Sequence, residues 1–135
     1  MRNTAGECPG VYYLRLQRDG WTMTGRGEPH GWQSDVTRFE KPVDDRWLLR
    51  KLAHTTIDHP PGKGCYYDEH ELHDKVAGRT IACFDWEWAD VDRTRLVWSA
   101  GGKLFAGHLG NNGLRDVREL YDFNPMSFEP IEAPY

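Results

Sequence analysis

The fold is decided by the stretch DWEWADVDRTRLVWSAGGKLFAGHLGNNGLRDVRELYDFN, which runs from Asp85 to Asn124. Short apolar runs alternate there with turn-forming residues, a pattern that predicts four strands joined by tight turns. We therefore expect an antiparallel β-meander and, for the whole chain, an all-β fold built from hairpins. The meander sets the fold class, but it does not set the function.

The centre of this stretch is a hairpin around Gly101 and Gly102. Glycine takes positive φ at both central positions of a two-residue turn without strain. The turn fixes the register, and the predicted cross-strand pairs are Ala100–Lys103, Ser99–Leu104 and Trp98–Phe105. The aromatic pair is worth about 0.2–1 kcal/mol relative to alanine.

The two faces of this hairpin are both apolar. Because side chains alternate along a strand, one face carries Leu96, Trp98, Phe105 and Leu109, and the other carries Val97, Leu104 and Ala106. We therefore expect the hairpin to be covered on both sides.

The order of elements in the stretch is a tryptophan-rich strand, an aspartate-rich turn, RLVWS, a glycine turn, KLFAGHL, a polar loop and RELYDF. This order resembles one blade of a Tol-type β-propeller repeat over about 40 of the 135 residues. The family's usual Ser-Pro-Asp-Gly turn is replaced here by Ala89–Arg93. The resemblance implies a propeller-like blade and no single activity, because the family includes binding scaffolds and hydrolases.

The rest of the chain also predicts hairpins, around Asp19-Gly20, Asp44-Asp45 and Val76–Gly78. The arm from Arg46 to His54 fits a strand or a short helix, and the hairpin signal before it favours a strand. The expected architecture is a set of propeller-like blades, or a small barrel or curled sheet. The chain has room for about three blades, and propellers close with four to eight, so the propeller alternative predicts a homo-oligomer.

Length and composition indicate one globular domain. We expect residues 1–10 to be a disordered lead and residues 11–135 to form a single β-rich domain. The net charge of −4 argues against nonspecific nucleic-acid binding. The residues from Met1 to Tyr12 lack a signal-peptide core, and no apolar run is long enough for a transmembrane helix. Three cysteines without CxxC spacing indicate a reduced, cytoplasmic protein, with a cross-strand disulfide between Cys65 and Cys83 as the alternative.

The densest group of ligand-type side chains is the run from Asp68 to Asp74. Imidazole and carboxylate groups bind Zn, Mn or Fe. On a strand His70 and His73 point to opposite sides, whereas on a helix they lie one turn apart. A solvated, charged strand face is the simpler interpretation. The candidate metal ligands are His54, His59, Asp68, His70 and His73.

Tryptophans are the second group of candidates. Trp86 and Trp88 are predicted to share one strand face, where they would form a binding platform or pack in the core. Trp21 and Trp32 border turns or loops and are expected to be exposed. The candidate binding residues are Trp21, His30, Trp32, His59, Trp86 and Trp88.

These patterns favour a non-catalytic binding or assembly module that presents aromatic and loop surfaces to a protein or a small ligand. It requires no cofactor, and its expected contact loops are Gly25–Gln33 and Thr55–Gly64. One alternative is a metal-dependent hydrolase that uses the histidines and carboxylates around a divalent ion. Another is an oligomeric sugar-binding lectin. No serine lies in a GxSxG motif, and neither nucleic acid nor a membrane is expected as a partner.

Overall fold

The computed structural model describes residues 19–26, 34–56, 66–131 and 133–134, which form nine β-strands and no helix. The strands are β1 (Thr22–Arg26), β2 (Ser34–Pro42), β3 (Trp47–Thr56), β4 (Tyr66–Asp74), β5 (Arg79–Cys83), β6 (Trp88–Asp92), β7 (Arg95–Ala100), β8 (Lys103–Gly110) and β9 (Gly113–Asp122). The prediction of an all-β antiparallel protein is confirmed.

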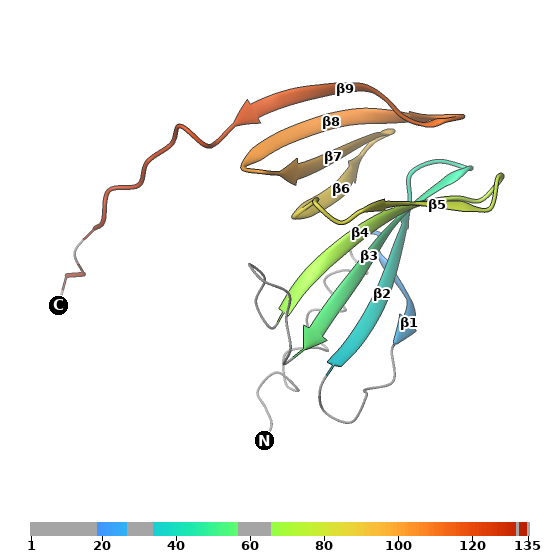
Figure 1. The fold of residues 1–135 in the computed structure, drawn as a ribbon, viewed down its shortest axis with the longest axis horizontal. Helices are drawn as coiled ribbons and strands as arrows, with labels where there is room; N and C mark the ends of the chain where they lie inside the picture. Colours follow the sequence, from blue (N-terminus) through green and yellow to red (C-terminus); the bar gives the residue numbers. More distant parts are fainter. Residues whose placement is uncertain (1–18, 27–33, 57–65, 132, 135) are drawn as a thin grey trace.

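The strands form two antiparallel sheets in which every strand pairs with its neighbour in the sequence. The first sheet has the order β1-β2-β3-β4-β5 and the second has the order β6-β7-β8-β9 (Figure 1). Neither sheet closes into a barrel over the described residues, so the curled-sheet alternative is the one observed. A four-stranded meander does not distinguish a propeller blade from other sheets, and the resemblance to Tol-type repeats stays a prediction.

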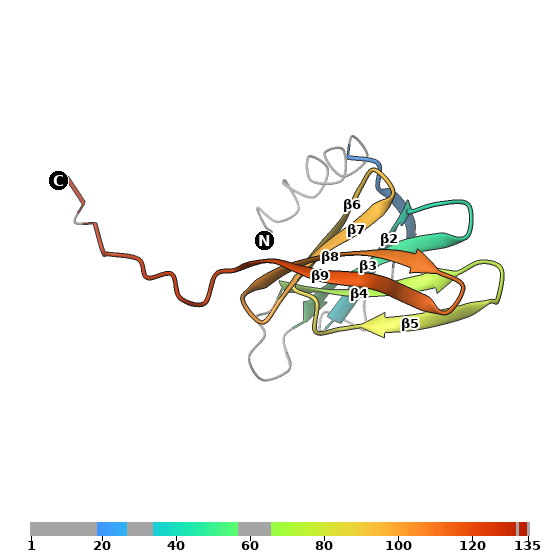
Figure 2. The same ribbon diagram turned by 90° about the horizontal axis from the view of Figure 1, so that it is seen from above.

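The second sheet lies over the first, and the core forms between them (Figures 1 and 2). Leu49 and Leu72 come from the first sheet and Leu96 from the second, and all three are fully buried. Each such leucine contributes about 1.5–3 kcal/mol through burial. Trp86 stacks on Trp98, with ring centroids 4.6 Å apart, and extends the core along the second sheet.

The hairpin around Gly101 and Gly102 has the predicted register. The two glycines have φ of 57° and 76°, the conformation that a side chain would strain. The observed pairs are Ala100–Lys103, Ser99–Leu104 and Trp98–Phe105. The face with Leu96, Trp98 and Leu109 is buried in the core, whereas on the other face Ala106 is buried and Val97 and Leu104 are half-buried.

The arm after Asp44 is a strand, as expected. The Asp44 carboxylate accepts hydrogen bonds from the backbone N–H groups of Arg46 and Trp47, at 2.8 Å and 2.7 Å. These bonds close the turn between β2 and β3 with local polar contacts. β1 pairs with β2, and the predicted partner arm before Asp19 lies outside the described residues.

Candidate functional site

Strand β4 separates the candidate metal ligands onto two faces. Asp68 and His70 point to the same side as the buried Leu72, between the sheets, and His73 points to the opposite side. His70 is 1% exposed. The prediction that His70 and His73 face opposite sides of a strand is therefore confirmed, and the pleat keeps them from sharing one ion.

His54 lies on the outer face with His73, but far from it. His54 pairs with Tyr67 and His73 pairs with Leu48, so six residues of β3, roughly 20 Å, separate the two positions. His54 instead stacks on Tyr67 at 4.6 Å and contacts the Glu69 carboxylate at 2.8 Å.

The expectation that the histidines converge on one ion is thus wrong for His54, His70 and His73. Among the described residues, no group of three or more His, Cys, Asp or Glu side chains is arranged to hold a metal. The remaining member of the set, His59, lies outside the described residues.

Trp21 is part of the core, and the expectation that it is exposed is wrong. It is 4% exposed, because it packs against the inner face of the first sheet. The ammonium groups of Lys41 and Lys51 lie 5.9 Å and 5.6 Å from its ring centroid, and each also contacts a carboxylate, Asp90 and Asp68 respectively. The other loop candidates, His30 and Trp32, lie outside the described residues.

Trp86 and Trp88 do not share a face, which corrects the prediction. Strand β6 begins only at Trp88, so the two-residue alternation does not extend back to Trp86. Trp86 turns inward onto Trp98, whereas Trp88 is 47% exposed. Of these two candidates, only Trp88 presents an aromatic surface to solvent.

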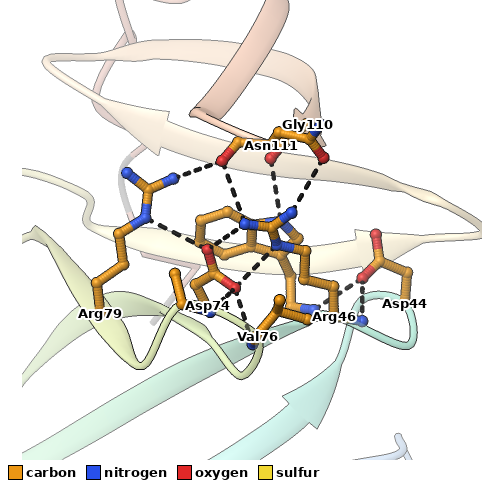
Figure 3. Close-up of polar contacts among 9 residues, drawn as sticks. Asp44, Arg46, Asp74, Val76, Arg79, Gly110 and Asn111 are labelled. Carbon is orange, nitrogen blue, oxygen red and sulfur yellow. Dashed lines mark hydrogen bonds and ion pairs between the residues drawn. The ribbon is translucent and has the colours of Figure 1, made fainter.

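Asp74, the last residue of the ligand-rich run, is a buried carboxylate whose two arginine partners connect the sheets. The side chain of Asp74 is fully buried, and it accepts hydrogen bonds from Arg46 at 2.9 Å and 2.8 Å and from Arg79 at 3.3 Å (Figure 3). Both arginines also reach Asn111, in the turn between β8 and β9. Arg46, Asp74, Arg79 and Asn111 are called the Asp74 network below.

The Asp74 network is a structural contact rather than a reactive one. The hydrogen bond from Arg46 holds the pKa of the Asp74 carboxyl well below its usual range, against burial, and backbone N–H groups of Ala77 and Val76 act in the same direction. A carboxylate satisfied by this many donors stays ionised and is a weak proton acceptor. Beside it, the Trp47 indole N–H donates to Gly110 O at 3.2 Å, so four hydrogen bonds to Gly110 and Asn111 join the sheets here.

Exposed apolar side chains concentrate at the other end of the chain. Eight of the thirteen large hydrophobic residues that the structure describes as exposed belong to β9 and the segment after it. A run of exposed apolar side chains along one stretch of the sequence makes that stretch a candidate interaction element, since isolated exposed apolar residues are ordinary. The eight are Leu114, Val117, Leu120, Tyr121, Phe123, Met126, Phe128 and Ile131.

Residues 123–131 and 133–134, called the C-terminal segment below, leave the end of β9 and lead away from both sheets (Figures 1 and 2). Two hydrogen bonds to the β7–β8 turn set their starting direction: Phe123 N–H donates to Gly102 O at 2.9 Å, and Asn124 Nδ2 donates to Gly101 O at 3.0 Å. Farther along, Phe128 is 88% exposed and Ile131 is 94% exposed.

The chemistry of this segment is apolar and acidic. From Phe123 onward the sequence has two carboxylate side chains, Glu129 and Glu132, and no lysine, arginine or histidine. Three prolines, Pro125, Pro130 and Pro134, restrict the backbone to extended conformations. The sequence therefore did indicate this surface. Its apolar residues are separated by prolines, and the stretch is too short to form a core of its own that would bury them.

Comparison with protein-family models, curated proteins and solved structures finds no match to this chain. Among the residues that the structure describes, no helix combines the length and the apolar character needed to cross a bilayer.

Proposed function

We propose that this protein is a non-catalytic binding module whose contact element is the C-terminal segment together with the exposed apolar side chains of β9. The observation that carries the proposal is the exposure of Phe128 and Ile131 at 88% and 94% on a segment that leads away from the fold. Burying these side chains against a partner is favourable, because the hydrophobic free energy of their burial is not gained within their own domain.

The proposed contact is made by side chains rather than by addition of a strand to β9. β9 is an edge strand of the second sheet, but its register against β8 shifts at two places. Asp116 has φ of 54°, a conformation that interrupts the regular ladder. Bulges and charges of this kind protect a sheet edge from pairing with another strand.

The prolines favour binding by this segment. A segment already restricted to extended conformations loses less conformational entropy when a partner orders it. The acidic character of the segment adds selectivity, because it fits an apolar surface bordered by cations and repels an acidic one. The partner we propose is therefore a protein with an apolar, positively bordered surface.

A reducing compartment such as the cytoplasm belongs to the same proposal. Cys83 is a buried free thiol. Burial, followed by the nearby carboxylates of Asp85 and Glu71, raises the pKa of Cys83 to about 12. A thiol of this kind is inert toward disulfide exchange, and a non-catalytic role makes no demand on its reactivity.

Photo-cross-linking tests the proposal. The photoreactive amino acid p-benzoylphenylalanine replaces Phe128 in one variant and Tyr66 in a control, since Tyr66 is an aromatic residue of comparable exposure at the start of β4. In cells of the native host, we expect protein adducts from position 128 and far fewer from position 66. Equal yields from the two positions, or no adducts from position 128, would contradict the proposal.

A further inference from the structure

The outer face of the second sheet has the chemistry that complements the C-terminal segment. Cross-strand pairing aligns Trp88, Ser99, Leu104 and Tyr121 in one row across the four strands. Trp88 and Tyr121, at the two ends of this row, are exposed, and Leu104 is half-buried between them. The row is an aromatic and aliphatic strip that runs across the sheet.

Cations border this strip on the β9 side. Arg118 pairs with Ala106 and Arg115 pairs with His108 on the same outer face, and both arginines are exposed. The β9 side of the face thus joins apolar side chains to positive charge, and on the β6 side the carboxylates of Asp90 and Asp92 are already paired with Lys41 and Arg95. The C-terminal segment joins apolar side chains to negative charge, with Glu129 between Phe128 and Ile131.

We infer that the C-terminal segment of one copy docks on the outer face of the second sheet of another copy, in a reciprocal dimer. This inference rests on the proposed function and names its partner. Both complementary surfaces occur in every chain, so one two-fold axis satisfies both segments at once. Charge complementarity between Glu129 and the cations at Arg115 and Arg118 sets the orientation.

The reach of the segment fits this arrangement. Crossing four strands spans roughly 15 Å, and the nine residue-to-residue steps of an extended chain from Asp122 to Ile131 span roughly 30 Å. The hydrogen bonds of Phe123 and Asn124 to the β7–β8 turn direct the segment away from its own sheets. A second copy therefore receives it more readily than the sheet from which it starts.

Sedimentation equilibrium of charge-reversed variants tests the inference. E129K places a lysine opposite the arginines, and R118E places a glutamate opposite Glu129, so each variant alone is expected to dimerise at least about tenfold more weakly than the unmodified protein. An equimolar mixture restores both interfaces, because the introduced lysine of one variant meets the introduced glutamate of the other while the second interface is unchanged. We expect the mixture to dimerise within about threefold of the unmodified protein.

A second pair of variants tests the apolar contribution without changing charge. F128S removes an exposed ring of the C-terminal segment, and V76S removes an exposed side chain from the β4–β5 turn as a control. We expect F128S to weaken the dimer and V76S to leave it unchanged, with both variants keeping the melting temperature of the unmodified protein at a concentration where all three are monomeric. A dimer that survives both F128S and E129K would overturn the inference.

The inference would also be overturned if the unmodified protein stays monomeric up to about 1 mM. That outcome is distinct from failure of the proposed function. A monomer whose position 128 cross-links to a different protein keeps the binding role and removes only the second copy as the partner. An adduct with the mass of two copies supports both proposals.

Discussion

Asn124 closes the β7–β8 turn from outside, by donating its side-chain Nδ2 to the main-chain oxygen of Gly101 across 3.0 Å. The next residue of the turn, Gly102, accepts from Phe123 N–H, and a Cβ at Gly102 would collide with the Asn124 side chain. The turn and the C-terminal segment therefore depend on each other, and the glycine of the turn provides the space in which the segment starts.

Alanine substitutions at the two glycines separate these effects. Both glycines have positive φ, so each alanine is expected to cost about 1–2 kcal/mol of unfolding free energy. Gly102→Ala also displaces Asn124, whereas nothing lies within 4 Å of a Cβ at Gly101. We expect Gly102→Ala to cost about 0.5–1.5 kcal/mol more than Gly101→Ala in urea denaturation.

The Asn124→Ala background is the control for this prediction. Without the Asn124 side chain, the extra cost of Gly102→Ala over Gly101→Ala should disappear, since the collision and the lost hydrogen bond are both removed. An extra cost that persists in that background would show that the backbone, rather than Asn124, distinguishes the two glycines.

The buried Asp74 carboxylate should make the folded protein less stable in acid. Its pKa is lowered in the folded protein by the hydrogen bond from Arg46, so its contribution to stability is complete above the ordinary aspartate pKa of about 4 and is lost as the pH falls below it. We expect the unfolding free energy of the unmodified protein to fall as the pH is lowered from about 5 to 2. Asp74→Asn should be less stable at pH 7 and lose less over the same range.

Asp92→Asn is the matched control, because Asp92 and Arg95 form an exposed ion pair at 3.0 Å. Exposed pairs contribute little, so this variant should follow the unmodified protein within about 0.5 kcal/mol across the pH range. Parallel pH profiles for Asp74→Asn and the unmodified protein would contradict the role assigned to the Asp74 network.

Cys83 should be unreactive in the folded state. In a variant with Cys8 and Cys65 replaced by serine, a raised pKa of about 12 leaves about three orders of magnitude less thiolate at pH 8 than an ordinary cysteine has. We expect slow labelling by Ellman's reagent in buffer and complete, rapid labelling in urea. Labelling of the native protein at the rate of a free thiol would contradict its burial.

The local parts of the fold followed from the sequence. Gly101-Gly102 fixed both the turn and the register of β7 on β8, because glycine chemistry and side-chain alternation act over a few residues. The opposite orientations of His70 and His73 followed from the same alternation. The orientation of Trp86 did not follow from alternation, because it depends on where β6 begins. Strand boundaries shift by a residue or two with tertiary contacts.

Long-range contacts could not be predicted in this way. The Asp74 network joins residues that lie 28 and 65 positions apart in the sequence, and no periodicity links Asp74 to Asn111. Trp21 is buried for the same reason, since its cover comes from strands that pair later in the chain. The candidate interaction surface includes the proline-containing segment after β9. Its apolar residues do not alternate as in a strand, so the sequence pattern assigns them to no buried face.

Deletion of residues 126–135 is the most direct test of the account, because it separates binding from folding. The segment is exposed and leads away from the core, so at a concentration where both proteins are monomeric the shortened protein should keep its unfolding free energy within about 0.5 kcal/mol. In sedimentation equilibrium with the full chain as reference, it should lose the association expected of the intact protein. A strongly destabilised protein, or a shortened protein that dimerises as tightly as the full chain does, would contradict the claim that this exposed segment makes the contact with a second copy.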